Sequence, residues 1–219
     1  MSRWLIFAAV LAITGAVGLE AKRVDELRQK TPRLVERILE RWADSLPELS
    51  DEEIDILVAV EDPTFWDNDG IDFRTPGQGW TTLSQALAKR LYYKYYVPGL
   101  QKLDVVLFTR FALIPEISKE DILDAFVAAA YLGTKDGRAV VGFASAAEAW
   151  FGKPFSELKR REYIELVAML IGPDEINPRT NTLRLDERAD RIERLVAGEC
   201  APIVPWDVHL NMCGPVTQH

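Results

Sequence analysis

The feature that most constrains this chain is a charge-free, apolar stretch at residues 4–19, WLIFAAVLAITGAVGL. Arg3 precedes it, and Glu20, Lys22 and Arg23 follow it. A transmembrane helix needs about 20 apolar residues, whereas the apolar core of a signal peptide is shorter and ends at small residues. Residues 16–18 are only a weak cleavage site. We therefore expect an uncleaved signal anchor over residues 1–20, with a cleaved signal or a buried N-terminal helix as alternatives.

The charge of the chain is unevenly distributed. Its 219 residues include 34 acidic and 26 basic ones, which gives a net charge of −8. A balance this acidic argues against a protein that coats nucleic acid, so no nucleic-acid partner is expected. Residues 75–114 differ, because they contain one acid, Asp104, and five bases: Lys89, Arg90, Lys94, Lys102 and Arg110. We interpret this basic, aromatic-rich window as a local site for an anion.

Helical signals dominate the remaining sequence, and strand signals are scarce. Residues 21–49 are charged and helix-prone, which is typical of a membrane-proximal stalk. Further amphipathic helices are expected to end at Glu61, near Tyr96 and near Gly133, the last as a C-cap. The pattern predicts one mostly α-helical domain over residues 50–198, followed by a tail at residues 199–219.

The tail contains both cysteines of the chain, Cys200 and Cys213. In an oxidising compartment they could pair and pin the tail. Two unrelated thiols are the alternative.

Glu61 is the first candidate for chemistry. It lies seven residues after Ile54, four after Leu57 and three after Val58, so it falls on the apolar stripe of its helix. A carboxylate on that face is desolvated, and its pKa should rise toward the range that a general base needs. The alternative is a glutamate at the helix end that turns to solvent.

The helix after the glycine-containing loop is the second candidate. Thr81 and Thr82 stand at its start, where backbone N–H groups and the helix dipole favour anions. Gln85 and Lys89 follow at helical spacing. Hydroxyls, an amide and a lysine at a helix start suit a phosphate or pyrophosphate, although an ordinary capped helix has the same pattern.

These two segments, in this order, resemble the motifs of glycosyltransferase family 51, the peptidoglycan glycosyltransferases. The family's E-D-x-x-F-x-x-H-x-G motif is matched by EDPTFWDNDG at residues 61–70, with Asn68 in place of the histidine. Its G-G-S-T-I-T-Q-Q-L-A-K-N-L motif is matched by GWTTLSQALAKRL at residues 79–91. Weaker similarities continue to Asn177-Pro178, so the resemblance spans residues 50–180.

The resemblance implies a lysozyme-like helical fold and a glycosyltransferase anchored in the bacterial inner membrane and facing the periplasm. Its implied substrate is lipid II, a polyprenyl-pyrophosphate-linked sugar, and its implied partners are the membrane and other cell-wall synthesis proteins. Glu61 matches the base that deprotonates the acceptor 4-hydroxyl, and a divalent metal such as Mg²⁺ or basic groups would offset the charge of the leaving group. Further motif positions are assigned to substrate binding: Asp62, Phe65, Asn68, Thr82, Gln85, Lys89 and Lys102.

The family's third motif, R-K-x-x-E, is only partly present in QKLDV at residues 101–105. Lys102 is kept, whereas Gln101 and Val105 replace the arginine and the glutamate. Asp104 is a catalytic candidate, but it stands one residue early, and one residue on a helix turns a side chain by about 100°. Asp104 can therefore replace the missing carboxylate only if the backbone shifts.

Two hypotheses follow from this departure. A divergent glycosyltransferase would direct Asp104 into the same cleft as Glu61. A catalytically impaired relative, which binds lipid-linked intermediates or a synthase partner, would turn Asp104 away or pair it with Lys102. A lysozyme-like hydrolase, which needs water on the reacting face, and a periplasmic scaffold are further alternatives.

Overall fold

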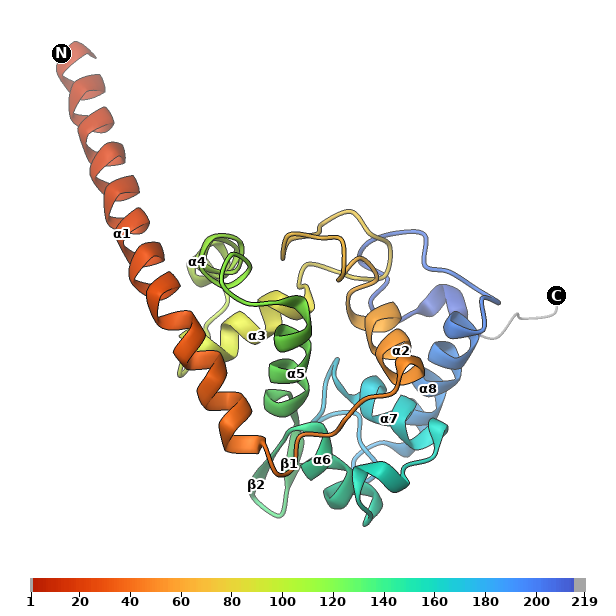
Figure 1. The fold of residues 1–219 in the computed structure, drawn as a ribbon. Helices are drawn as coiled ribbons and strands as arrows, with labels where there is room; N and C mark the ends of the chain where they lie inside the picture. Colours follow the sequence, from red (N-terminus) through yellow and green to blue (C-terminus); the bar gives the residue numbers. More distant parts are fainter. Residues whose placement is uncertain (1, 215–219) are drawn as a thin grey trace.

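The computed structural model describes residues 2–214, and helices dominate them (Figure 1). The α-helices are α1 (Ser2–Trp42), α2 (Asp51–Glu61), α3 (Leu83–Tyr92), α4 (Leu100–Phe108), α5 (Lys119–Ala129), α6 (Phe143–Ala146), α7 (Arg160–Met169) and α8 (Thr182–Val196). The shorter elements are the π-helical turns η1 (Thr109–Leu113) and η2 (Ala147–Phe151), the 3₁₀ turns η3 (Phe155–Glu157) and η4 (Asn211–Cys213), and the strands β1 (Tyr131–Lys135) and β2 (Arg138–Val141). The prediction of a mostly helical chain is confirmed.

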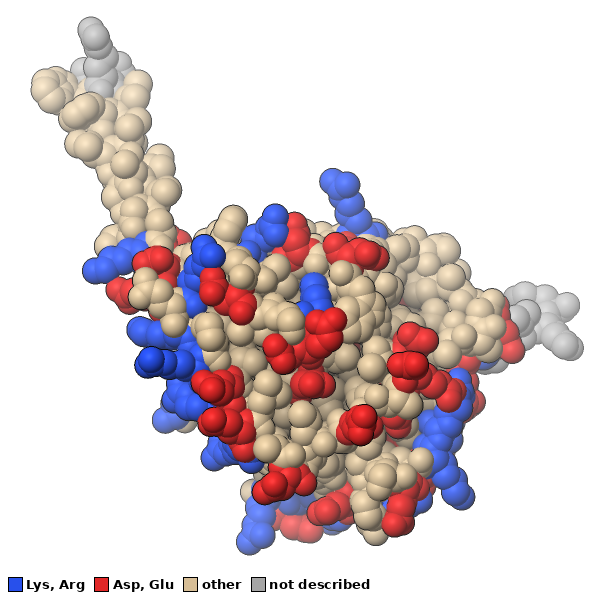
Figure 2. All heavy atoms as spheres, in the orientation of Figure 1, with Lys and Arg blue, Asp and Glu red and all other residues tan. Residues whose placement is uncertain are grey.

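The N-terminal part of α1 projects away from the other elements (Figure 1). It contains an 18-residue window of mean hydropathy 1.9, none of which is buried. In the view of Figure 2, the coloured part of this projection carries no Lys, Arg, Asp or Glu side chain until the helix approaches the domain. By length and composition this part of α1 is able to cross a membrane.

The C-terminal half of α1, which was predicted as a stalk, packs along the domain. It contacts α5, η1, α3 and α4. Val35 is 2% exposed, and the buried Thr31 hydroxyl lies 2.7 Å from the Tyr92 hydroxyl of α3. The stalk is therefore helical as far as Trp42 and forms one wall of the folded unit.

The buried core lies mainly between α2, α3, α5 and α7. Ile56 and Leu57 of α2, Ile122 of α5 and Ile164 of α7 are at most 1% exposed. The start of α2 is fixed locally, because Ser50 and Glu53 form a reciprocal capping box. Fixing that end of α2 fixes Glu61 at its other end.

α3 ends at Tyr92, four residues earlier than the predicted end near Tyr96. Tyr93 already has an extended backbone, with φ −125° and ψ 127°. Aromatic residues are weak helix formers, and Val97 precedes Pro98, which disfavours a helical conformation.

A β-hairpin stands where the sequence suggested the end of a helix at Gly133. α5 ends at Ala129, and β1 pairs with β2 in antiparallel register, with Thr134 opposite Ala139 and Lys135 opposite Arg138. Gly133 is a strand residue with φ +101°, and a Cβ there would approach the Pro173 carbonyl oxygen to 2.7 Å. The C-cap prediction is wrong, because the glycine serves close packing in the strand.

The tail is fastened to the domain by a disulfide and by arginines of α8. Cys200 and Cys213 are joined, which excludes two unrelated thiols. The Arg191 and Arg194 side chains donate hydrogen bonds to the main-chain carbonyls of His209 and Cys213. The tail also contacts the loop before α3.

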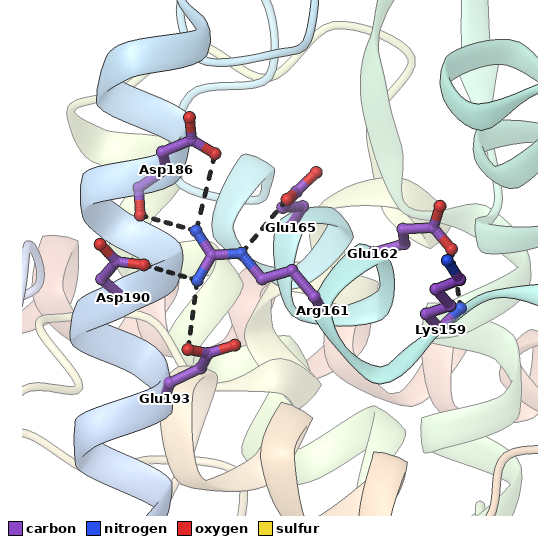
Figure 3. A network of polar contacts seen from close by, with 7 residues as sticks. All are labelled: Lys159, Arg161, Glu162, Glu165, Asp186, Asp190 and Glu193. Atoms are coloured by element: carbon purple, nitrogen blue, oxygen red, sulfur yellow. Dashed lines mark hydrogen bonds and ion pairs between the residues drawn. The ribbon is translucent and has the colours of Figure 1, made fainter.

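The outer faces of α7 and α8 are joined by an ion-pair network centred on Arg161 (Figure 3). Its guanidinium lies 2.6 Å from Asp190, 3.3 Å from Glu193 and 3.3 Å from Glu165, and it also contacts Asp186. One arginine thus shields four carboxylates and fixes α8 against α7. This fixed position matters because α8 also supplies a cavity residue.

Candidate active site

A cavity of about 580 Å³ lies where α2 ends, between α3, α5, the start of β1, α8 and the tail. Its charged lining residues are one acid and four bases: Glu61, Lys89, Arg90, Lys94 and Arg188. None of these four bases forms a contact ion pair with a carboxylate within residues 2–214. A cavity with this excess of positive charge favours an anionic ligand.

Glu61 is the last residue of α2, and its side chain is mostly buried at the cavity wall. Burial raises the pKa of Glu61 to about 7; the positive charge of Arg188 opposes the rise, and the neighbouring Asp62 adds to it. The rise predicted from its position on the apolar stripe is confirmed. A carboxylate with this pKa is able to accept a proton and release it again near neutral pH.

Arg188 of α8 reaches the same cavity from a buried position, with 4% of its surface exposed. Its Nε donates to the Ala168 carbonyl at 3.1 Å, and Nη1 donates to the Val208 carbonyl at 2.8 Å. α7 and the tail therefore fix this guanidinium.

Asp62 is fully buried and ties the loop after α2 to the start of α3. Its carboxylate accepts hydrogen bonds from the Asn68 side-chain amide at 2.7 Å and from the Leu83 N–H at 3.0 Å. Burial raises the pKa of Asp62 to about 6, although these hydrogen bonds and Lys119 oppose the rise. Asp62 is not among the cavity-lining residues, and its contacts fix the position of α3 relative to Glu61.

Phe65 and Asn68 both contact Lys119 of α5. Phe65 is fully buried, with the Lys119 ammonium 4.6 Å from its ring centroid. The Asn68 side-chain oxygen accepts from the Gly70 N–H at 2.8 Å and from Lys119 at 3.3 Å. The structure brings neither residue to the cavity lining.

Thr82 and Gln85 cap α3. The Thr82 hydroxyl accepts from the Gln85 N–H, and the Gln85 side-chain oxygen accepts from the Thr82 N–H. The Thr82 hydroxyl also donates to the Gly70 carbonyl at 2.8 Å. Thr82 lines the cavity, whereas Gln85 does not.

Of the two lysines predicted to bind substrate, Lys89 lines the cavity and Lys102 does not. The Lys89 Nζ donates to the Thr81 hydroxyl at 3.3 Å. Burial and the nearby charge of Lys102 lower the pKa of Lys89. The exposed Lys102 ammonium lies 5.2 Å from the ring centroid of Trp80, so it adds positive charge beside a cavity-lining residue.

The structure does not direct Asp104 toward Glu61. Its carboxylate accepts from Arg23 of α1 at 3.1 Å and from the Tyr93 hydroxyl at 3.3 Å, and it is absent from the cavity lining. α4 is helical from Leu100 to Phe108, and on this helix Asp104 faces α1 and Tyr93. We correct its expected placement: Asp104 joins α4 to α1, and this position does not favour the predicted catalytic role.

The described residues do not form a cluster suited to a resident metal. Within residues 2–214, no group of three or more His, Cys, Asp or Glu side chains could hold one ion. The cavity lining contains only one carboxylate, that of Glu61. The expected divalent cation therefore finds no ligand set in the protein alone, and the lysines and arginines of the cavity are the groups placed to offset negative charge.

Comparison with known proteins identifies the family. The transglycosylase family pattern matches residues 33–197. The chain belongs to the transglycosylase family. The predicted lysozyme-like glycosyltransferase fold behind an apolar N-terminal helix is thereby confirmed.

The chain is similar to much longer proteins. It is 30% identical over 83% of its length to penicillin-binding protein 1B of Vibrio cholerae, and it spans 24% of that protein. It is 29% identical over 65% of its length to penicillin-binding protein 1B of Escherichia coli, and it spans 18% of that protein. It is 26% identical over 64% of its length to penicillin-binding protein 2D of Bacillus subtilis, and it spans 21% of that protein.

Arg188 and Val208 are cavity residues that sequence reasoning did not find. Arg188 falls on the buried stripe of α8, between Leu185 and Ile192, so an arginine at an apolar position was the available signal. Val208 reaches the cavity from the tail, and no local pattern in the sequence marks it.

Proposed function

We propose that this member of the transglycosylase family transfers a sugar from a polyprenyl-pyrophosphate-linked donor of the lipid II type to an acceptor 4-hydroxyl. The observation that carries the proposal is Glu61, a carboxylate with a pKa of about 7 in the wall of a cavity whose other charged lining residues are all cations. The cations suit the pyrophosphate of such a donor, and the carboxylate suits the proton of the acceptor.

In the proposed reaction, Glu61 accepts the proton of the acceptor 4-hydroxyl as the oxygen attacks the anomeric carbon of the donor. The new glycosidic bond forms, and the bond from the anomeric carbon to the pyrophosphate oxygen breaks. Polyprenyl pyrophosphate leaves with both bonding electrons. Lys89, Arg90 and Lys94 offset its negative charge, because fixed cations stabilise charge that develops at a leaving group.

The second candidate function is a catalytically impaired relative that binds lipid-linked intermediates or a synthase partner. The ion pair between Asp104 and Arg23 favours it, since it leaves Glu61 as the only carboxylate of the cavity lining. Glycosyl transfer with an oxocarbenium-like transition state uses two carboxylates in many enzymes. The two candidates share a ligand and differ in turnover.

In this proposal, the apolar part of α1 determines where the protein is located in the cell. This part would cross the bacterial inner membrane once, with the domain on the periplasmic side, where a lipid-linked donor meets the cavity. The disulfide between Cys200 and Cys213 supports an oxidising compartment. Cell-wall synthesis proteins are the proposed partners.

The experiment that tests the proposal measures polymerisation of labelled lipid II by the full chain in detergent micelles. The wild type is compared with Glu61→Gln and Asp104→Asn, and binding of lipid II is measured on the same samples. The proposal expects product from the wild type and from Asp104→Asn, and none from Glu61→Gln. Binding of lipid II without product from the wild type would favour the impaired relative.

A further inference from the structure

Arg188 is a buried cation whose hydrogen bonds neutralise none of its charge. Nε and Nη1 donate to two main-chain carbonyls, those of Ala168 and Val208. Within residues 2–214, Nη2 donates to no acceptor, and Arg188 lines the cavity. An uncompensated buried charge is costly, and the cavity therefore needs a negative charge near Arg188.

Glu61 is the one acid that meets this need from the cavity lining. The two side chains do not form a contact ion pair, yet the charge of each stabilises the charged form of the other. Because carbonyls of α7 and the tail hold the guanidinium, it cannot swing away when the carboxylate changes its protonation state. The pair thus consists of a fixed cation and a carboxylate open to a ligand.

Other charges around the pair do not replace Arg188. Asp62, next to Glu61 in the chain, raises the pKa of Glu61, whereas Arg188 lowers it. The charge of Arg191 lowers the pKa of Arg188, and the charge of Asp207 raises it. Burial and the charge of Arg188 lower the pKa of His209.

The remaining walls differ in charge. α3 supplies Lys89 and Arg90, and the segment after it supplies Lys94. The lining residues from α5 and from the end of α7 are apolar.

We propose that Arg188 is a positioning residue for the transfer reaction, because its guanidinium is held on two carbonyls in the same cavity as Glu61 and there favours the ionised, proton-accepting carboxylate. This inference rests on the proposed function. α8 and the tail supply no other charge to the cavity lining, so they act on Glu61 through the Arg188 side chain alone. After the base takes up the acceptor proton, the same guanidinium favours release of that proton and return to the ionised form.

The test compares Arg188→Gln and Arg188→Lys with the wild type. Glutamine keeps donors for the carbonyls but removes the charge, and lysine keeps the charge. Without the charge, the pKa of Glu61 rises, so the acid limb of the pH–rate profile should move to higher pH by about one pH unit. The rate of Arg188→Gln near neutral pH should then fall roughly fivefold and recover at higher pH. Arg188→Lys should keep the limb near its wild-type position.

The matched control is Arg194→Gln. Arg194 also lies on α8 and donates to a tail carbonyl, that of Cys213, but it does not line the cavity. Loss of its hydrogen bond should lower the melting temperature and leave the acid limb in place. If Arg188→Gln behaves in the same way, Arg188 is only a fastening for the tail, and the inference is overturned.

A direct titration separates this inference from the proposed function. The Glu61 carboxyl is followed by ¹³C NMR of the full chain in detergent micelles, and Glu61→Gln assigns its signal. An alkaline shift of this titration in Arg188→Gln supports the inference, and an unchanged titration in that variant refutes it. If the wild type transfers no sugar from any polyprenyl-pyrophosphate donor, the proposed function fails, whereas the titration still decides whether Arg188 controls Glu61.

Discussion

Replacing Glu61 with glutamine should stabilise the folded chain at alkaline pH while removing the proposed base. Burial raises the pKa of Glu61 from 4.5 to about 7. The folded state therefore holds this proton more tightly than the unfolded chain does, and stability is lost as the pH rises from 4.5 through 7. Below pH 4.5 the Glu61 carboxyl is protonated in both the folded and the unfolded state, so its burial no longer lowers the unfolding free energy.

The size of the effect follows from the pKa difference. One pKa unit corresponds to about 1.4 kcal/mol, so ionisation of Glu61 costs the wild type about 3 kcal/mol at alkaline pH. The raised pKa already includes the attraction of Arg188, and glutamine is as neutral as the protonated carboxyl. The variant does not bear the cost of ionisation, so we expect it to gain about 3 kcal/mol in unfolding free energy at alkaline pH.

The assay is chemical denaturation of the full chain in detergent micelles, followed by tryptophan fluorescence at about pH 4 and about pH 8. Glu61→Gln should be more stable than the wild type at the higher pH and nearly equal to it at the lower one. A variant that is less stable at the higher pH, or equally stabilised at both, would refute the burial of Glu61 as the cause of its raised pKa.

Asp72 provides a control of opposite sign. Burial acts to raise its pKa, but hydrogen bonds from Thr75, the Arg74 N–H and Thr64 outweigh this effect and bring the pKa to about 2. A lowered folded-state pKa contributes stability that is present above 3.8 and lost as the pH falls toward 2. Asp72→Asn should therefore destabilise the chain by nearly the same amount at about pH 8 and about pH 4, and by less only as the pH falls from 3.8 toward 2.

Three further substitutions test the cavity and the tail. Lys89→Met should weaken binding of a polyprenyl pyrophosphate roughly tenfold, because a charge-assisted contact is lost; equal affinities by fluorescence anisotropy would remove Lys89 from the anion site. Asp104→Asn should change the unfolding free energy by less than about 1 kcal/mol, since its ion pair is partly exposed, and should leave the transfer rate unchanged. A large loss of rate in this folded variant would restore Asp104 as the second carboxylate. Replacing Cys200 and Cys213 together by serine should lower the unfolding free energy by about 2–3 kcal/mol; wild-type stability in denaturation would show that the disulfide does not hold the tail.

Local rules explain which parts of the site were predictable from sequence. Ser50 begins α2 and Thr82 begins α3, and each capping box is contained within four consecutive residues. The position of Glu61 on the buried face follows from helical periodicity alone. These features depend on neighbours in the chain, so a sequence pattern is sufficient to place them.

The hairpin was missed although a local signal was present. Asp136 and Gly137 occupy its turn, with φ 50° and 74°, and Asp-Gly is a preferred pair for a two-residue hairpin turn. The apolar run before it, which continues α5, favoured a longer helix. Where two local signals compete, the tertiary packing of Gly133 against Pro173 decides between them.

Motif matching alone did not separate the residues that line the cavity from those that build its frame. Among the matched positions, Glu61, Thr82 and Lys89 line the cavity, whereas Asp62 and Phe65 are buried behind it. A carboxylate that satisfies the first N–H groups of a helix is needed to hold that helix, whether or not it touches a ligand. The same motif therefore encodes both the chemistry and its support.

The tail shows why a short loop and a distant segment must be considered together. The Gly77 and Gly79 N–H groups of the loop donate to the Val204 and Pro205 carbonyls at 3.0 and 2.7 Å. Both glycines have positive φ, and a Cβ on Gly79 would approach Val208 to 2.6 Å. Val208 in turn lines the cavity and accepts a hydrogen bond from Arg188. The tail thus both closes the wall of the cavity and fixes the charge beside the base, so the electrostatics of Glu61 depend on a segment that lies outside every motif of the sequence.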